Sequence, residues 1–100
     1  MAEVQITEKE FQATVRQMAK AFGWHVFTTW NSRRSPAGEP DLRLVHPIKQ
    51  RMIWVELKTE KGKLTALKKE AIELLEMAGE EVYVWRPSDW ELIEQTLREL

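Results

Sequence analysis

The sequence predicts an α/β protein, more closely an α+β one, whose elements follow the order αβββαβα. Apolar residues recur at helical spacing in three segments, which begin near residues 7, 65 and 88. Runs rich in β-branched and aromatic residues lie between them, at 24–30, near 41–46 and 52–59, and at 82–86. These two patterns predict four strands accompanied by three helices.

The first helix has a start signal and an end signal. Thr7 suits its N-cap and Glu10 follows three residues later, which predicts a capping box. Ile6 is placed to pack against Phe11, and Gly23 suits the position just after the helix. The helix is expected to carry an apolar side made of Phe11, Val15, Met18, Ala19 and Phe22.

The later elements are predicted in the same way. A turn that contains Pro47 favours pairing of the two middle strands as a hairpin. Ser88 and Glu91 after Pro87 predict a second capping box at the last helix. The helix expected over 65–78 has an apolar side of Leu64, Leu67, Ala71, Leu74, Leu75 and Ala78. The last helix has one of Trp90, Ile93, Leu97 and Leu100.

Composition limits the broad class of the protein. A chain of 100 residues with 43% hydrophobic content suits one domain over 1–100, because a chain this short buries only about 60–70% of its unfolded surface. There is no cysteine for disulfides or thiolate metal sites. The first residues do not resemble a signal peptide, and no apolar run approaches the roughly 20 residues of a membrane helix. We expect a soluble, cytoplasmic protein without a membrane partner.

Charge is unevenly placed along the chain. The net charge is −1, but residues 30–70 hold ten Lys or Arg and five Asp or Glu, whereas the remainder holds five and eleven. A basic segment of this kind either binds nucleic acid phosphates or forms a solvated charged face. Its position around the acidic pair described next favours nucleic acid. The expected phosphate contacts are Arg33, Arg34, Lys61, Lys63, Lys68 and Lys69.

Two carboxylates and a lysine converge in the predicted hairpin. Alternation along 52–59 sends Ile53, Val55 and Leu57 to one face and Trp54, Glu56 and Lys58 to the other. Pairing of the strands would bring Asp41 beside Glu56. Two carboxylates in contact repel unless a cation lies between them, and a hard divalent cation is the usual solution. The pattern predicts a metal site with an adjacent lysine.

Each candidate residue also has a purely structural interpretation. Glu10 completes the capping box with Thr7. Asp41 after Pro40 suits a turn, and Glu56 with Lys58 suits a surface cross-strand pair. The two histidines, His25 and His46, have no partner at ligand spacing and are interpreted as structural or surface residues.

The motifs together resemble a known family. Pro40-Asp41 followed after fourteen residues by Glu56-Leu57-Lys58 resembles the signature of the PD-(D/E)xK nuclease superfamily. Gly38-x-Pro40-Asp41, the string from Glu56 to Thr65 and the stretch Val84-Trp85-Arg86-Pro87-x-Asp89-Trp90 resemble the stand-alone VRR-NUC (virus-type replication-repair nuclease) domain over nearly the whole chain. The chain departs from the family pattern at Glu39, Lys68 and Thr28-Thr29.

This resemblance implies a restriction-endonuclease-like fold, with a mixed four-stranded sheet flanked by helices. It implies a DNA endonuclease that cuts branched substrates such as Holliday junctions in replication, recombination or repair. Mg²⁺ or Mn²⁺ would be held by Asp41, Glu56 and the Leu57 carbonyl, with Glu10 reaching the metal directly or through water. Lys58 would complete the catalytic set with Asp41, Glu56 and Glu10.

The resemblance also bears on assembly and origin. Stand-alone members resemble homodimers, and Trp30, Trp85 and Trp90 are the predicted interface residues; the competing interpretation is that these side chains pack within one subunit. Small stand-alone versions look phage-like, which favours a phage or prophage gene. Two other classes stay open: a nucleic-acid-binding module without turnover, and an interaction module of a replication machine.

Overall fold

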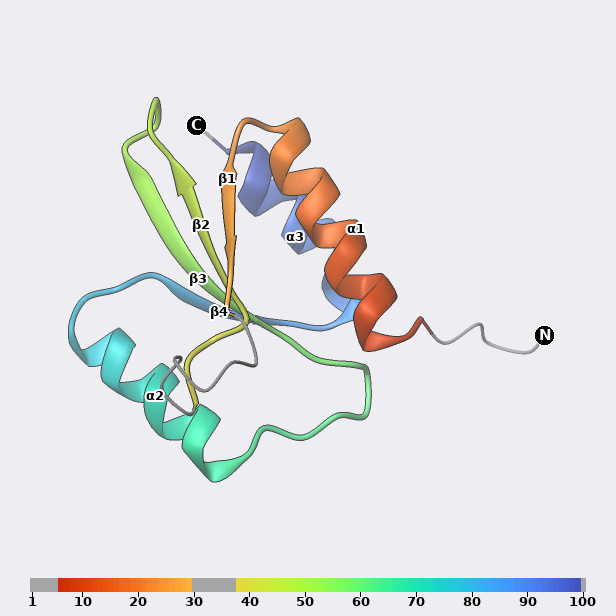
Figure 1. Cartoon of the computed structure of the whole chain (residues 1–100), viewed down its shortest axis with the longest axis vertical. Helices are drawn as coiled ribbons and strands as arrows, with labels where there is room; N and C mark the ends of the chain where they lie inside the picture. The colour runs from red at the N-terminus through yellow and green to blue at the C-terminus, as the bar shows by residue number, and fades with distance from the viewer. Residues whose placement is uncertain (1–5, 30–37, 100) are drawn as a thin grey trace.

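The computed structural model describes residues 6–29 and 38–99. In this part of the chain the elements follow the predicted order, with a short 3-10 helix before the last α-helix. They are α1 (Glu8–Ala21), β1 (His25–Thr28), β2 (Leu42–His46), β3 (Arg51–Leu57), α2 (Ala66–Met77), β4 (Val82–Trp85), η1 (Pro87–Asp89) and α3 (Trp90–Arg98). Figure 1 shows this arrangement.

The strands form one mixed sheet in the order β1-β2-β3-β4. β1, β2 and β3 are antiparallel, whereas β4 runs parallel to β3 after the crossover through α2. The turn after β2 contains Gln50 with a φ of 53° and makes the predicted hairpin. The α+β fold class and the mixed four-stranded sheet are therefore confirmed.

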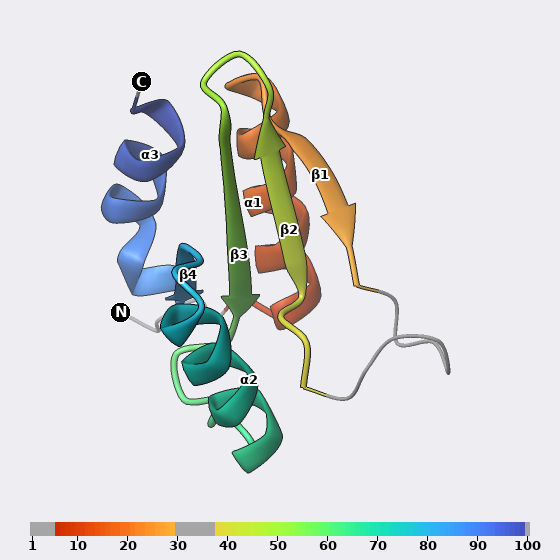
Figure 2. The same ribbon diagram turned by 90° about the vertical axis from the view of Figure 1, so that its left-hand side faces the viewer.

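The helices divide between the two sides of the sheet. α1 and α3 contact each other and cover one face, and α2 lies on the opposite side near β4, as the two perpendicular views show (Figures 1 and 2). The buried core lies between the α1–α3 pair and the sheet. Its members are Phe11, Val15, Ala19, Trp24, Leu42, Leu44, Ile53, Val55, Leu57, Trp85, Ile93 and Leu97.

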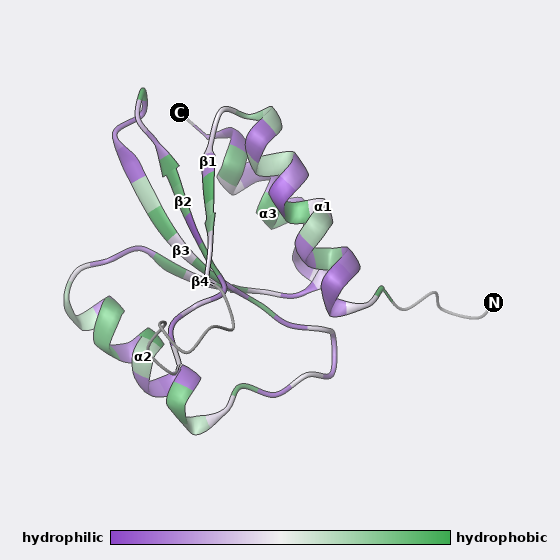
Figure 3. Cartoon of the chain, in the orientation of Figure 1, coloured by the Kyte–Doolittle hydropathy of each residue, from purple (hydrophilic) through white to green (hydrophobic). Residues whose placement is uncertain are grey.

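Helix α2 contributes no buried residue in the described structure. Leu67 and Leu74 of its predicted apolar side are more than half exposed, and Met77 is 83% exposed. Figure 3 shows hydrophobic residues along α2, which lies apart from α1 and α3. The amphipathic pattern of this helix leaves an apolar surface exposed, and the helix touches the sheet mainly at β4.

The predicted ends of α1 are confirmed. Thr7 is the N-cap and its Oγ1 accepts a hydrogen bond from the Glu10 N–H at 3.1 Å. Gly23 follows the helix with a φ of +93°, a conformation that favours glycine. The Trp24 N–H donates to the Ala19 carbonyl at 3.0 Å, and the Trp24 indole donates to the Leu97 carbonyl at 2.9 Å. Trp24 therefore ends the helix and contacts α3 instead of opening β1, which is shorter than the expected 24–30.

The capping box predicted at Ser88 is wrong. The Asp89 carboxylate accepts the Arg86 N–H at 2.8 Å, and Pro87 fixes the first turn, so a 3-10 turn forms and α3 begins only at Trp90. Ser88 donates its own N–H to the Glu60 carboxylate. The side chain of Ser88 is not the cap of this helix.

The aromatic residues assigned to an interface lie mainly inside the subunit. Trp85 is 1% exposed and stacks on Tyr83 with 5.3 Å between ring centroids. Trp90 is partly buried and packs against the core. The interface prediction is wrong for Trp85, because this side chain is buried inside the subunit. It stays a prediction for the partly buried Trp90, and Trp30 lies outside the described residues. His46 is structural, as expected: its Nε2 pairs with the Phe22 carbonyl at 3.1 Å and its Nδ1 accepts the Lys49 N–H.

Candidate active site

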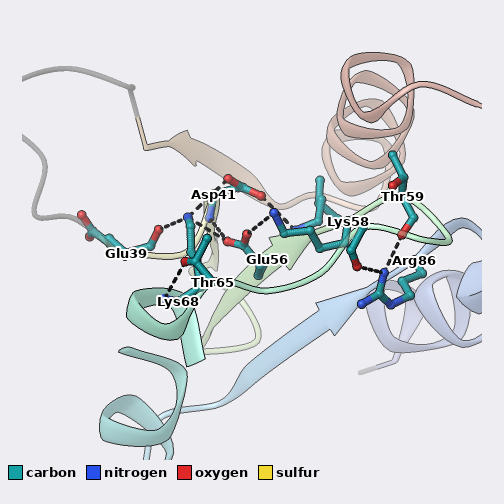
Figure 4. Close-up of polar contacts among 10 residues, drawn as sticks. Glu39, Asp41, Glu56, Lys58, Thr59, Thr65, Lys68 and Arg86 are labelled. Carbon is teal, nitrogen blue, oxygen red and sulfur yellow. Dashed lines mark hydrogen bonds and ion pairs between the residues drawn. The ribbon is translucent and has the colours of Figure 1, made fainter. Parts of the chain in front are cut away.

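The register of the hairpin places Asp41 opposite Glu56. Leu42 at the start of β2 pairs with Val55, so the residue before Leu42 faces the residue after Val55. The Asp41 N–H donates to Glu56 Oε1 at 3.2 Å, and the next residue on β3, Leu57, donates its N–H to Asp41 Oδ2 at 3.0 Å. The predicted approach of the two carboxylates is confirmed (Figure 4).

The backbone around Asp41 is held from the neighbouring strand. Thr29, just after β1, donates its N–H to the Asp41 carbonyl at 2.8 Å and its hydroxyl to the Pro40 carbonyl at 2.6 Å. Pro40 is fully buried. The threonine at this place, one of the departures from the family pattern, therefore anchors the segment that carries Asp41.

Glu56 is a fully buried carboxylate, with 0% exposure. Burial raises the pKa of its carboxyl, and the nearby Asp41 raises this pKa further. The hydrogen bond from Lys68 and the charges of Lys68 and Lys58 lower it. The resulting pKa lies above the ordinary value of a glutamate. Oε2 is buried and finds no hydrogen-bond partner among the described residues. An unsatisfied buried carboxylate oxygen is costly, and a cation would relieve that cost.

Lys68 from α2 lies against both carboxylates. Its Nζ is 3.1 Å from Glu56 Oε1, 3.8 Å from Asp41 Oδ1 and 2.7 Å from the Glu39 carbonyl (Figure 4). Thr65, the N-cap of α2, accepts the Lys68 N–H at 3.2 Å and so sets the start of the helix. In this structure the Lys68 ammonium pairs with the acidic residues, which differs from its expected role as a phosphate contact.

Lys58 approaches Glu56 from the other side. Its Nζ is 3.8 Å from Glu56 Oε2, the oxygen that lacks a hydrogen bond within the described chain. Its N–H donates to the Trp85 carbonyl at 3.0 Å, which extends the pairing with β4 beyond the end of β3. The backbone of Lys58 is thereby fixed, while its side chain remains 18% exposed.

The turn after Lys58 is held by Arg86. Arg86 Nη1 donates to the Thr59 carbonyl and, at 2.6 Å, to the Gly62 carbonyl. Figure 4 shows this arginine beyond Lys58. Lys61 and Lys63 in and after the turn are exposed, as a phosphate contact requires. Arg33 and Arg34 lie outside the described residues.

Glu10 occupies a different environment from the acidic pair. Its carboxylate accepts a hydrogen bond from the Thr7 hydroxyl at 2.9 Å, and its N–H donates to the Thr7 Oγ1, so the predicted capping box is half formed: in the described structure the carboxylate bonds the Thr7 side chain in place of the Thr7 N–H. Within residues 6–29 and 38–99, no three His, Cys, Asp or Glu side chains gather closely enough to hold a metal ion. The structure brings together Asp41, Glu56 and Lys58, and it does not bring Glu10 into their group.

Comparison with solved structures gives matches over most of the chain. A structure described as a VRR_NUC domain aligns with a TM-score of 0.75 and 22% identity over 92% of this chain and 95% of that chain. This agreement over nearly the whole of both chains identifies the fold. The chain has the fold of a VRR-NUC domain. A second structure, described as a VRR_NUC domain protein, aligns with a TM-score of 0.69 and 21% identity over 93% and 87% of the two chains.

A third solved structure resembles this VRR-NUC fold over a smaller part of the chain. Hjc, a Holliday junction resolvase from Archaeoglobus fulgidus, aligns with a TM-score of 0.56 and 22% identity over 77% of this chain and 66% of that one. No protein-family model and no curated protein matches the sequence.

The acidic pair of this VRR-NUC fold fits a hard divalent cation. The donors are oxygens only: the carboxylates of Asp41 and Glu56, which both lie beside the Lys68 ammonium, and Glu56 has a buried oxygen that lacks a hydrogen bond in the described chain. Mg²⁺ usually binds through one or two carboxylates and completes its shell with water and substrate phosphate oxygens. Asp41 and Glu56 are therefore sufficient protein carboxylates for such an ion, and a third is not required.

The sequence alone did not single out Arg43, which lies on the open face of the sheet. Its guanidinium is 5.1 Å from the Phe27 ring centroid and 5.6 Å from that of Trp54. These three residues line a shallow hollow of about 160 Å³ together with Thr28, Thr29 and Glu39. The register of the strands is the signal that could have revealed this group, because Phe27, Arg43 and Trp54 lie opposite one another on neighbouring strands.

Proposed function

We propose that this protein is a metal-dependent endonuclease that hydrolyses phosphodiester bonds in DNA. The observation that carries the proposal is the contact of Asp41 with buried Glu56, with the Lys58 ammonium 3.8 Å from the Glu56 oxygen that lacks a hydrogen bond within the described chain. The VRR-NUC fold supports it. Asp41, Glu56 and the Leu57 carbonyl would hold Mg²⁺ or Mn²⁺, and Glu10 would act from outside this group through water.

The residues divide the chemistry between them. A bound divalent cation supplies a lowered pKa of water and neutralisation of phosphate charge. Lys58 adds a positive charge that would orient the attacking water and stabilise the extra negative charge of the transition state. Glu56 is fully buried, which keeps bulk water from its carboxylate and strengthens these interactions.

Branched DNA is the proposed substrate, in replication, recombination or repair. The support is the fold shared with a protein described as a Holliday junction resolvase. The exposed Lys61 and Lys63 would contact phosphates on the strand to be cut, as would Arg33 and Arg34. Contacts of this kind carry no sequence information, so selectivity would come from the shape of the DNA.

A homodimer is proposed as the working form, because a branched junction has two strands that are cut at symmetric positions. Its interface would use Trp30 and Trp90 together with the exposed apolar residues Leu67, Leu74 and Met77 of α2, which take the place of buried Trp85. Sedimentation at micromolar protein concentration measures this directly. A mass near the 11.8 kDa of one chain would contradict the dimer.

The experiment that tests the function compares DNA substrates. The purified protein is incubated with a four-way junction, a flap, a nicked duplex and a plain duplex, each with Mg²⁺, with Mn²⁺ and with a chelator. Cleavage of the branched substrates that requires the metal ion is expected. Absence of cleavage under all conditions would contradict the proposal.

A second candidate function rests on the exposed apolar surface of α2. Leu67, Leu74 and Met77 project from the helix at spacings that place them on one side. An interaction module that binds a replication protein without cutting DNA would use such a surface, and one that binds nucleic acid would use the exposed Lys61 and Lys63. A monomeric protein that binds junctions but shows no metal-dependent cleavage would favour this alternative.

A further inference from the structure

Lys68 lies where a cation between the two carboxylates would lie. Its ammonium contacts three oxygens from three residues: Glu56 Oε1 at 3.1 Å, Asp41 Oδ1 at 3.8 Å and the Glu39 carbonyl at 2.7 Å. These are carboxylate and carbonyl oxygens, the ligand types that hard divalent cations take. The chain thus supplies its own cation to the acidic pair.

This arrangement has an electrostatic reason. Two carboxylates that lie beside the same ammonium repel each other, and the repulsion is strengthened here because Glu56 is fully buried. The lysine ammonium neutralises part of this charge in the metal-free protein. A divalent cation bound by the same oxygens would meet the like charge of Lys68 at very short range.

We propose that Lys68 competes with the catalytic divalent cation for the oxygens of Asp41 and Glu56, so that metal binding requires the Lys68 side chain to leave the pair. This inference rests on the proposed function, since it concerns the same site. Once it has left, the ammonium is free to contact a DNA phosphate at the site. Lys68 would then couple metal loading to substrate binding.

The surroundings allow the side chain to move while the helix stays in place. The Lys68 side chain is 23% exposed and reaches the site on a flexible four-carbon stem. The backbone of the helix start is fixed: Thr65 caps it, and Gly38 packs so closely that a Cβ there would lie 2.6 Å from the Leu67 carbonyl oxygen. Rotation of the Lys68 side chain toward solvent therefore needs no shift of α2.

The test measures metal binding without DNA. Isothermal titration with Mn²⁺ compares the wild-type protein with Lys68→Gln, which removes the charge and keeps a shorter polar side chain. Lys69→Gln is the matched control, because Lys69 is exposed on the same helix and loses the same charge. Lys68→Gln is expected to bind Mn²⁺ about tenfold more tightly, and Lys69→Gln to stay within about twofold of wild type.

Thermal unfolding gives a second readout and monitors folding of the variants. Without metal, Lys68→Gln should melt below wild type, because Asp41 and Glu56 lose their neutralising partner. Saturating Mn²⁺ should raise its melting temperature more than that of wild type, since ligand affinity adds to stability. Lys69→Gln should show neither change.

The outcomes separate this inference from the proposed function. Equal Mn²⁺ affinity in Lys68→Gln and wild type, or an equal gain in Lys69→Gln, would overturn the competition. Tighter binding in Lys68→Gln alone would support it even if no DNA is cut. Conversely, metal-dependent cleavage by wild type with unchanged affinity in Lys68→Gln would leave the nuclease proposal standing and remove the role of Lys68.

Discussion

At the scale of single residues, Glu56 determines the character of the site. It is buried on a strand whose neighbours Val55 and Leu57 belong to the core, so its carboxylate cannot turn into solvent. Its partners are the Asp41 N–H, Lys68 and, more distantly, Lys58. A charged group held in this way is costly for stability, and such a cost is typical of functional sites.

The Arg51–Glu81 pair provides a residue-scale prediction about pH. The hydrogen bond from Arg51, at 3.0 Å between Nε and Oε1, is the main cause that lowers the pKa of the Glu81 carboxyl, with Tyr83 adding a second hydrogen bond. Because the folded-state pKa lies below the unfolded one, this stabilisation is present above the unfolded pKa and is lost as pH falls through the folded pKa. Glu81→Gln should cost about 1–2 kcal/mol of unfolding free energy at pH 7.

The matched control is Glu94→Gln, which breaks the exposed pair with Arg98 and should cost less than about 0.5 kcal/mol. Urea denaturation at pH 7 and at progressively lower pH measures both variants. Wild type and Glu81→Gln should converge in stability as the pH falls below the folded pKa of Glu81. A constant difference between them across the whole range would contradict the linkage.

Residues near the site differ in how far the sequence could predict them. Asp41 and Glu56 follow from the hairpin, because strand pairing fixes which residues are opposite. The position of Lys68 does not follow, because it depends on how α2 returns over the end of the sheet after a loop. For Glu10 the local signal correctly predicted pairing with Thr7, although the carboxylate bonds the Thr7 hydroxyl and the capping box is only half formed.

At the scale of elements, the sequence correctly predicted features that depend on residues close together in the chain. The Thr7 cap and the apolar strand row of Ile53, Val55 and Leu57 appear as expected. The errors at Trp24 and Ser88 arise from partners that spacing cannot reveal. An indole bonds to a carbonyl 73 residues away, and the Asp89 carboxylate takes the Arg86 N–H.

Gly38 provides the prediction at this scale, because it joins the loop before Asp41 to α2. Its φ is +92°, and a Cβ would lie 2.6 Å from the Leu67 carbonyl oxygen. Gly38→Ala should therefore suffer both backbone strain and a clash with backbone. Gly79→Ala has a similar φ of +86° but open space around the Cβ, so only the strain remains.

We expect Gly38→Ala to be less stable than Gly79→Ala by at least about 1 kcal/mol, measured by urea denaturation. It should also lower DNA cleavage, since Glu39 and Asp41 follow directly in the chain. Equal destabilisation by the two substitutions would show that the loop is not held against α2 as described.

At the scale of the whole molecule, the layers explain why the site is at one end of the sheet. α1 and α3 build the core on one face, α2 lies on the other side near β4, and the carboxylates lie where β2 begins and β3 ends (Figure 2). Lys58, Lys61, Lys63, Lys68 and Lys69 lie at this end, in the segment after β3 and at the start of α2, whereas Lys49 and Arg51 lie at the opposite end of the hairpin. No helix in the described parts of the chain is long and apolar enough to cross a membrane.

The central claim is that the Asp41–Glu56 pair is the catalytic centre of a nuclease. Metal-dependent cleavage of a four-way junction by wild type, Asp41→Asn, Glu56→Gln and the control Glu73→Gln tests it most directly. Glu73 is exposed on α2 and loses the same charge. Cleavage should fall about 100-fold or more in the first two variants, with folding retained by circular dichroism, and stay near wild type in the control. Unchanged cleavage in folded Asp41→Asn and Glu56→Gln would contradict the account.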